Sequence, residues 1–121
     1  MSKKVLIVED YADSREFMKF AVEVLGYDAL LATDGLEAVL SVKNEIPNLI
    51  LMDIGLPVID GMKATRIIRE YLNGIKVPIV AVTAFGKSCF QEAIEAGCDD
   101  VIGKPVDFDS IEPVLNQYLG H

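Results

Sequence analysis

The sequence predicts an α/β fold, a doubly wound parallel sheet of five strands with five helices. Five short apolar runs are each followed by a helical pattern, and no long linker or repeat interrupts the series. The runs are continuously hydrophobic, which is typical of parallel strands covered on both faces. Right-handed crossovers then place helices on both faces of the sheet. We therefore expect one domain over residues 1–121, with no effector domain in this chain.

Two strand-helix units open the chain. The first strand covers residues 4–9, and Gly26 ends the helix that follows it. Apolar residues at helical spacing indicate that helix, namely Phe17, Phe20, Ala21, Val24 and Leu25. A second strand at 29–32 precedes a capping-box pattern, Asp34-x-x-Glu37, which begins the next helix. That helix is expected to run through Leu36, Val39, Leu40 and Lys43, before Pro47.

The third unit carries the central acidic residue. Its strand, residues 49–52, is apolar throughout and delivers Asp53 at its C-terminal end. We expect Asp60-Gly61 to provide turn and capping chemistry rather than a ligand. The following helix has one stripe of residues and ends before Gly74; the stripe is Met62, Thr65, Ile68 and Leu72.

The last two units end their strands in Thr83 and Lys104. The fourth strand is residues 79–82, and its helix, through Phe90, Ala93 and Ile94, stops at Gly97. The fifth strand is short, residues 101–103. The final helix is expected to begin near Asp107 or Asp109 and to run through Ile111, Val114, Leu115 and Tyr118. Pro113 is compatible with it only in the first turn or at a local distortion.

Polar side chains follow four of these strands at their C-terminal ends. They are Glu9 with Asp10, then Asp53, Thr83 and Lys104. Because the C-terminal ends of parallel strands share one edge, these side chains can converge there. Two like charges about 4 Å apart repel by about 4 kcal/mol at an effective dielectric near 20, so three carboxylates favour a hard divalent cation. Mg²⁺ fits such oxygen ligands and retains room for a phosphate oxygen.

A carboxylate beside such a cation can attack phosphorus and form an acyl phosphate. Lys104 could neutralise the phosphoryl oxygens, and Thr83 could donate a hydrogen bond to one of them. The incoming group adds about two negative charges, which a hydroxyl and an ammonium group can sense.

Composition excludes several classes of protein. The net charge of −8, without a cluster of Lys or Arg, argues against nucleic-acid or anionic-membrane partners. Although 51% of the residues are hydrophobic, no run approaches the roughly 20 residues of a membrane span. Cys89 and Cys98 are expected to be reduced thiols rather than metal ligands. The start of the chain is unlike a signal peptide, so we expect a cytoplasmic protein. The single histidine, His121, is assigned no phosphotransfer role.

Four strings in order make the chain resemble the receiver domain of bacterial two-component response regulators. They are Val-Leu-Ile-Val-Glu-Asp at 5–10, Leu-Met-Asp-Ile-Gly-Leu-Pro-Val-Ile-Asp-Gly at 51–61, Val-Thr-Ala at 82–84 and Gly-Lys-Pro at 103–105. The resemblance covers the whole chain. It implies a flavodoxin-like sheet in the order 2-1-3-4-5, as in a chemotaxis regulator of this family.

The resemblance also implies roles for the site residues. Asp53 would accept a phosphoryl group from a sensor histidine kinase or a histidine phosphotransfer protein. Asp10, Asp53 and the Gly55 carbonyl would bind Mg²⁺ directly, and Glu9 would bind it through water. Thr83 would move toward the phosphoryl group, and Lys104 would bridge to it. The chain would then be a switch with a protein target, not an enzyme beyond its own phosphorylation and dephosphorylation, and a monomer or a weak phosphorylation-dependent dimer.

Three positions depart from the family pattern. Val101 stands where an aromatic ring is usual, three residues before Lys104, so this position does not supply the aromatic part of the switch. Gly55 and Phe85 are the second residues after Asp53 and Thr83, and these positions flank the route of attacking water in the family. We hypothesise that Phe85 slows loss of the phosphoryl group by screening that water.

Rival functions fit the sequence less well. A haloacid-dehalogenase-type phosphatase needs a second acid at the position of Gly55 and a cap insertion, and a toprim-like nucleic-acid enzyme fails on the same glycine and on the charge. A flavodoxin-like cofactor site would need Ser, Thr or Gly where Glu9 and Asp10 stand. The alternative that stays open is a pseudo-receiver, an interaction module that works without phosphorylation.

Overall fold

The computed structural model describes residues 2–120, so His121 lies outside the described residues. Five parallel strands form one sheet in the order β2-β1-β3-β4-β5, which confirms the predicted fold class. The strands are β1 (Lys4–Val8), β2 (Asp28–Ala32), β3 (Leu49–Asp53), β4 (Ile79–Thr83) and β5 (Asp100–Gly103). The helices are α1 (Ala12–Val24), α2 (Gly35–Asn44), α3 (Gly61–Leu72), α4 (Phe90–Ala96) and α5 (Phe108–Leu119), with a 3₁₀ turn, η1 (Gly86–Cys89), before α4.

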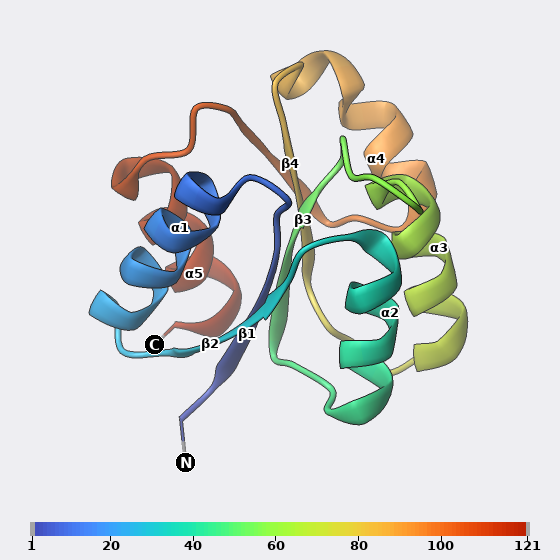
Figure 1. Ribbon diagram of the computed structural model, residues 1–121, viewed down its shortest axis with the longest axis horizontal. Helices are drawn as coiled ribbons and strands as arrows, with labels where there is room; N and C mark the ends of the chain where they lie inside the picture. The colour runs from blue at the N-terminus through green and yellow to red at the C-terminus, as the bar shows by residue number, and fades with distance from the viewer. Residues whose placement is uncertain (1, 121) are drawn as a thin grey trace.

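The sheet separates two hydrophobic cores. Helices α1 and α5 cover one face, and α2, α3 and α4 cover the other (Figure 1). Side chains alternate between the cores along each strand: Val5 and Ile7 of β1 face α1 and α5, whereas Leu6 and Val8 face the opposite helices. All five residues of β3 are buried. This burial on both sides explains why the strands are continuously apolar, and it fixes the edge at which they end.

Local capping sets where the helices begin and end. The carboxylates of Asp34, Asp60 and Asp107 each accept a hydrogen bond from a backbone N–H three residues later. The turn-and-cap role predicted for Asp60 is therefore confirmed. At the other ends Gly26 and Gly97 have φ of 95° and 114°, in the left-handed region that favours glycine.

The buried faces of α1 and α2 differ from the stripes that the sequence suggested. In α1 the core side chains are Met18, Ala21 and Val22, while Phe20 and Val24 are 61% and 56% exposed. In α2 the buried residues are Gly35, Ala38, Val39 and Val42, while Leu36 and Leu40 are exposed. Each helix carries apolar residues in two adjacent stripes, and contact with the sheet selects the one with the smaller side chains.

The remaining differences are small. Pro113 lies inside α5 in its second turn, which is not the first turn, one of the two places that the sequence allowed for it. β1 ends at Val8, one residue before the predicted end. Within residues 2–120, no helix combines the length and the apolarity needed to cross a membrane.

Candidate functional site

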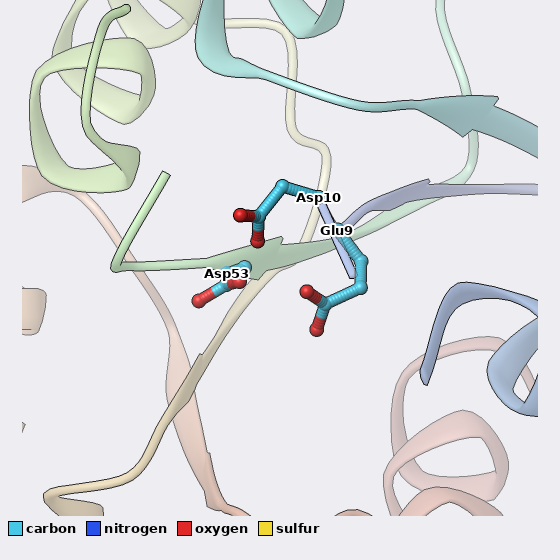
Figure 2. Close-up of side chains that lie close together, drawn as sticks. All are labelled: Glu9, Asp10 and Asp53. Atoms are coloured by element: carbon cyan, nitrogen blue, oxygen red, sulfur yellow. The ribbon is translucent and has the colours of Figure 1, made fainter. Parts of the chain in front are cut away.

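Three carboxylates gather where β1 and β3 end. Val8 pairs in register with Met52, so Glu9, Asp10 and Asp53 leave the sheet at the same edge. One carboxylate oxygen from each of these three acids lies within 4.8 Å of the others. Figure 2 shows the three side chains together at the end of β3. The structure thus brings together the acids that the sequence suggested as a metal site.

Asp53 is held on both sides of its carboxyl group. Its Oδ1 accepts a hydrogen bond of 3.0 Å from the backbone N–H of Gly55, and its Oδ2 accepts one of 3.1 Å from Lys104 Nζ. The residue is only 2% exposed. Gly55 therefore contacts the acid through its N–H group. The carboxylate is oriented before any ligand arrives.

Glu9 is a buried carboxylate with incomplete pairing. Its Oε2 accepts a hydrogen bond of 3.0 Å from the N–H of Tyr11. Its Oε1 lies 3.3 Å from Lys104 Nζ but accepts no hydrogen bond within residues 2–120. Burial is the main cause that raises the pKa of Glu9 to about 7, and the nearby Asp53 raises it further, while the Tyr11 N–H and Lys104 oppose the rise.

Lys104 is the cation that faces this acidic cluster. Its ammonium group contacts both Glu9 and Asp53, and its side chain is 30% exposed. Partial burial lowers the pKa of Lys104, but the hydrogen bond and charge of Asp53, together with Glu9, outweigh it, so the pKa is raised. The lysine therefore stays charged at neutral pH and is shared between two carboxylates.

Thr83 ends β4 at the same edge of the sheet. Val82, the residue before it, pairs with Asp53 in the sheet. The Thr83 hydroxyl accepts a hydrogen bond of 3.1 Å from the N–H of Phe85, and its carbonyl accepts one of 2.9 Å from the N–H of Lys104. No hydrogen bond within residues 2–120 joins its hydroxyl to Asp53 or to the Lys104 ammonium group. Thr83 is 4% exposed, and its hydroxyl group is hydrogen-bonded to the β4–α4 loop.

Two residues that support the site, Arg15 and Gly61, were not predicted from the sequence. Arg15 donates from Nη1 to the carbonyls of Glu9 and Asp10, at 3.0 and 3.3 Å, and so fixes the backbone of the acidic pair. At Gly61 a Cβ would lie 2.1 Å from the Asp53 carbonyl oxygen, so only glycine lets α3 start so close to β3. An arginine early in a helix carries no recognisable signal, whereas the Asp60-Gly61 pair was noted but was interpreted only as a cap.

The acid cluster fits a hard divalent cation. It offers carboxylate oxygens from three residues, and the buried Glu9 Oε1, which forms an ion pair with Lys104, accepts no hydrogen bond within the described chain. A buried carboxylate oxygen without a hydrogen bond is costly, and it would gain from a cation or from water bound to one. Oxygen ligands of this kind are those that Mg²⁺ prefers.

Comparisons with known proteins identify the family. The model of the response regulator receiver domain family matches residues 5–116. The polar-differentiation response regulator DivK of Brucella ovis is 34% identical over 121 residues, which cover 99% of this chain and 98% of DivK. The receiver domain of the sensor histidine kinase PA1611 from Pseudomonas aeruginosa PAO1, with a magnesium ion coordinated in its active site cleft, is 34% identical with a TM-score of 0.89, and the match covers 100% of both chains.

A second similar structure comes from a complex. It contains the histidine phosphotransfer protein Ypd1 of Saccharomyces cerevisiae and the receiver domain of the response regulator Ssk1. The match has 29% identity and a TM-score of 0.90, and it covers 97% of this chain and 88% of that chain.

Proposed function

The chain belongs to the response regulator receiver domain family of two-component signalling, and from this premise we propose that Asp53 is its phosphoacceptor. The observation that carries the proposal is the pairing of Asp53 with Lys104 inside a cluster of three carboxylates. A receiver domain that only bound partners would not need this costly group of charges. The phosphoryl donor would be a histidine kinase or a histidine phosphotransfer protein, the class represented by Ypd1 in the complex with Ssk1.

The proposed transfer of the phosphoryl group is a displacement at phosphorus. An Asp53 carboxylate oxygen attacks phosphorus, a P–O bond forms, and the P–N bond to the donor imidazole breaks. The electron pair of that bond stays with the leaving imidazole nitrogen, which takes up a proton. The Gly55 N–H fixes Oδ1 of Asp53, so Oδ2 is the oxygen beside Lys104. The Lys104 ammonium group can then move its contact from the carboxylate to the negatively charged phosphoryl oxygens.

The residues that would hold Mg²⁺ are Asp10 and Asp53 directly, the Gly55 carbonyl, and Glu9 through water. A bound cation would supply charge neutralisation for the phosphoryl oxygens. Thr83 would donate a hydrogen bond from its hydroxyl group to one phosphoryl oxygen after a shift away from its present contact with the Phe85 N–H. That shift is the proposed start of the signal, and its output would be a protein contact.

A mass measurement tests the phosphoacceptor. The protein is incubated with acetyl phosphate and Mg²⁺, and its intact mass is compared with that of Asp53→Asn and with a chelator control. We expect one phosphoryl addition that requires both Asp53 and the metal. Asp28→Asn is the matched control, because Asp28 is exposed at the opposite end of the strands. A folded protein that takes up no phosphoryl group would instead support the pseudo-receiver alternative.

A further inference from the structure

Helices α2 and α3 lie side by side on one face of the sheet, and their outer surface carries large apolar side chains (Figure 1). On α2, Leu36 and Leu40 are 45% and 56% exposed. On α3, Tyr71 is 44% exposed, and the half-buried Ile67 lies one turn before it. Residues four apart lie on the same side of a helix, so each pair forms a short apolar ridge. We refer to these four residues together as the α2–α3 patch.

Packing within the chain leaves this patch unused. In α2 the sheet contacts the stripe of smaller side chains, so the leucines of the second stripe lie outside the core. A single exposed leucine is ordinary, whereas several large apolar side chains on two neighbouring helices are typical of an interaction surface. The patch is therefore a surface that another molecule can cover.

A groove between the two helices carries charge beside the patch. It has a volume of about 390 Å³ and is lined by Lys43, Ile67, Glu70 and Tyr71. Lys43 lies three residues after Leu40, so it extends the ridge of α2. Its Nζ atom is 5.7 Å from the centre of the Tyr71 ring, a cation–π contact that restricts the lysine before anything binds.

Charge indicates which molecule covers the patch. The chain has a net charge of −8, so two copies of it repel each other over most of their surface. Helices α1, α4 and α5 each carry more acidic than basic residues. The groove between α2 and α3 is lined by one basic and one acidic residue. Two copies therefore meet with little repulsion at this groove.

The two charges at the groove also complement each other across a two-fold axis. Neither Lys43 nor Glu70 forms an ion pair within residues 2–120. Lys43 belongs to α2 and Glu70 to α3. A two-fold axis that runs along the groove places α2 of one copy over α3 of the other, so each lysine faces a glutamate. The same axis places the leucines of α2 on the apolar ridge of α3.

We propose that the α2–α3 patch joins two copies of this chain in a symmetric dimer, in which Lys43 of each copy pairs with Glu70 of the partner subunit. The apolar side chains of both patches are covered in this contact. They are few compared with the roughly 20–30 residues that each partner supplies to a standard interface, so we expect a weak dimer with a Kd on the order of 100 μM. The contact does not depend on phosphoryl transfer to Asp53.

Charge reversal tests the pairing. Sedimentation equilibrium of the whole chain without a phosphodonor, from about 10 μM to about 1 mM protein, measures the Kd of the dimer. We expect Lys43→Glu and Glu70→Lys each to raise this Kd at least about tenfold, because the two-fold axis turns both ion pairs into like-charge contacts. The double variant should return to within about threefold of the wild type. Glu70→Lys brings the net charge closer to zero, so an effect of total charge alone would strengthen the dimer instead.

A pair of apolar substitutions tests the location of the contact. Leu40→Ser should raise the Kd at least about fivefold. Phe20→Ser is the matched control, because Phe20 is 61% exposed on α1, which covers the opposite face of the sheet. All the substituted side chains are exposed, and circular dichroism confirms that each variant is folded.

The outcomes separate clearly. Weaker association of each single charge reversal, with recovery in the double variant, supports the proposed dimer. A wild-type protein that stays monomeric at about 1 mM overturns it. A dimer that the single reversals leave unchanged, that the double variant fails to restore, or that Phe20→Ser weakens as much as Leu40→Ser overturns it as well. The proposed role of Asp53 is tested separately, by the intact-mass measurement.

Discussion

Replacing Glu9 by glutamine should make the stability of the protein less dependent on pH. The Glu9 carboxyl is 0% exposed, and burial raises its pKa to about 7 in the folded protein from an ordinary value of 4.5. Between these two values the folded state holds a proton that the unfolded state has released. By linkage, the free energy of unfolding then falls as the pH rises from about 4.5 to about 7, and it is level above that.

The size of this effect follows from the same pKa. A gap of about two and a half pH units corresponds to about 3 kcal/mol, at about 1.4 kcal/mol per unit. Glutamine does not ionise, so the free energy of unfolding of the variant does not fall in this way as the pH rises. The difference in unfolding free energy, Glu9→Gln minus wild type, should therefore grow by about 3 kcal/mol between pH 4.5 and pH 7.5.

Urea unfolding followed by far-ultraviolet circular dichroism measures it, because the chain has no tryptophan. The series runs from pH 4.5 to 8.5 with a chelator, and Glu23→Gln provides the control of an exposed glutamate on α1. Saturating Mg²⁺ should restore part of the wild-type stability above pH 7, because a cation favours the ionised cluster. A difference that stays constant with pH, or that shrinks as the pH rises, would refute the reasoning.

Three further substitutions test separate features. Val58→Gly should stabilise the protein by about 0.5–1 kcal/mol in urea unfolding, since relief of the left-handed valine exceeds the entropy cost of glycine; an unchanged or lower value contradicts the strain. Gly61→Ala should destabilise it by about 1–3 kcal/mol in the same assay, because the new Cβ meets the Asp53 carbonyl oxygen; wild-type stability would show that α3 shifts freely. Phe85→Ala should raise the rate of phosphoryl loss at least about twofold, measured by intact mass after removal of the donor. An equal or slower rate would dispose of the water-screening hypothesis.

The sheet and the convergence of the strand ends could be predicted because both depend on local patterns. A strand buried on both faces must be apolar throughout, as β3 is, and parallel strands must end at one edge. The positions of Glu9, Asp10, Asp53 and Lys104 follow from those two facts. No long-range information was needed beyond the order of the strands.

Other features depend on contacts that no local pattern encodes. In α1 both Phe20 and Met18 lie in apolar stripes, and only packing against the sheet decides that Met18 is buried and Phe20 exposed. Val58 has a left-handed backbone conformation, which valine rarely adopts. Residue preferences alone therefore predict a negative φ at this position. The bond from the Phe85 N–H to the Thr83 hydroxyl exists only through the conformation of the loop.

The shared lysine links the proton of Glu9 to the chemistry proposed for Asp53. Lys104 lies 3.1 Å from one carboxylate and 3.3 Å from the other, so any step that draws its ammonium group toward a phosphoryl oxygen changes its distance to Glu9. Glu9 is buried, and Lys104 is one of the two groups that lower its pKa. A weaker contact with Lys104 therefore makes the ionised form of Glu9 less favourable, and a cation or a proton becomes correspondingly more favourable there. If Asp53 is phosphorylated as proposed, the charge state of Glu9 would be coupled to that step through the Lys104 side chain.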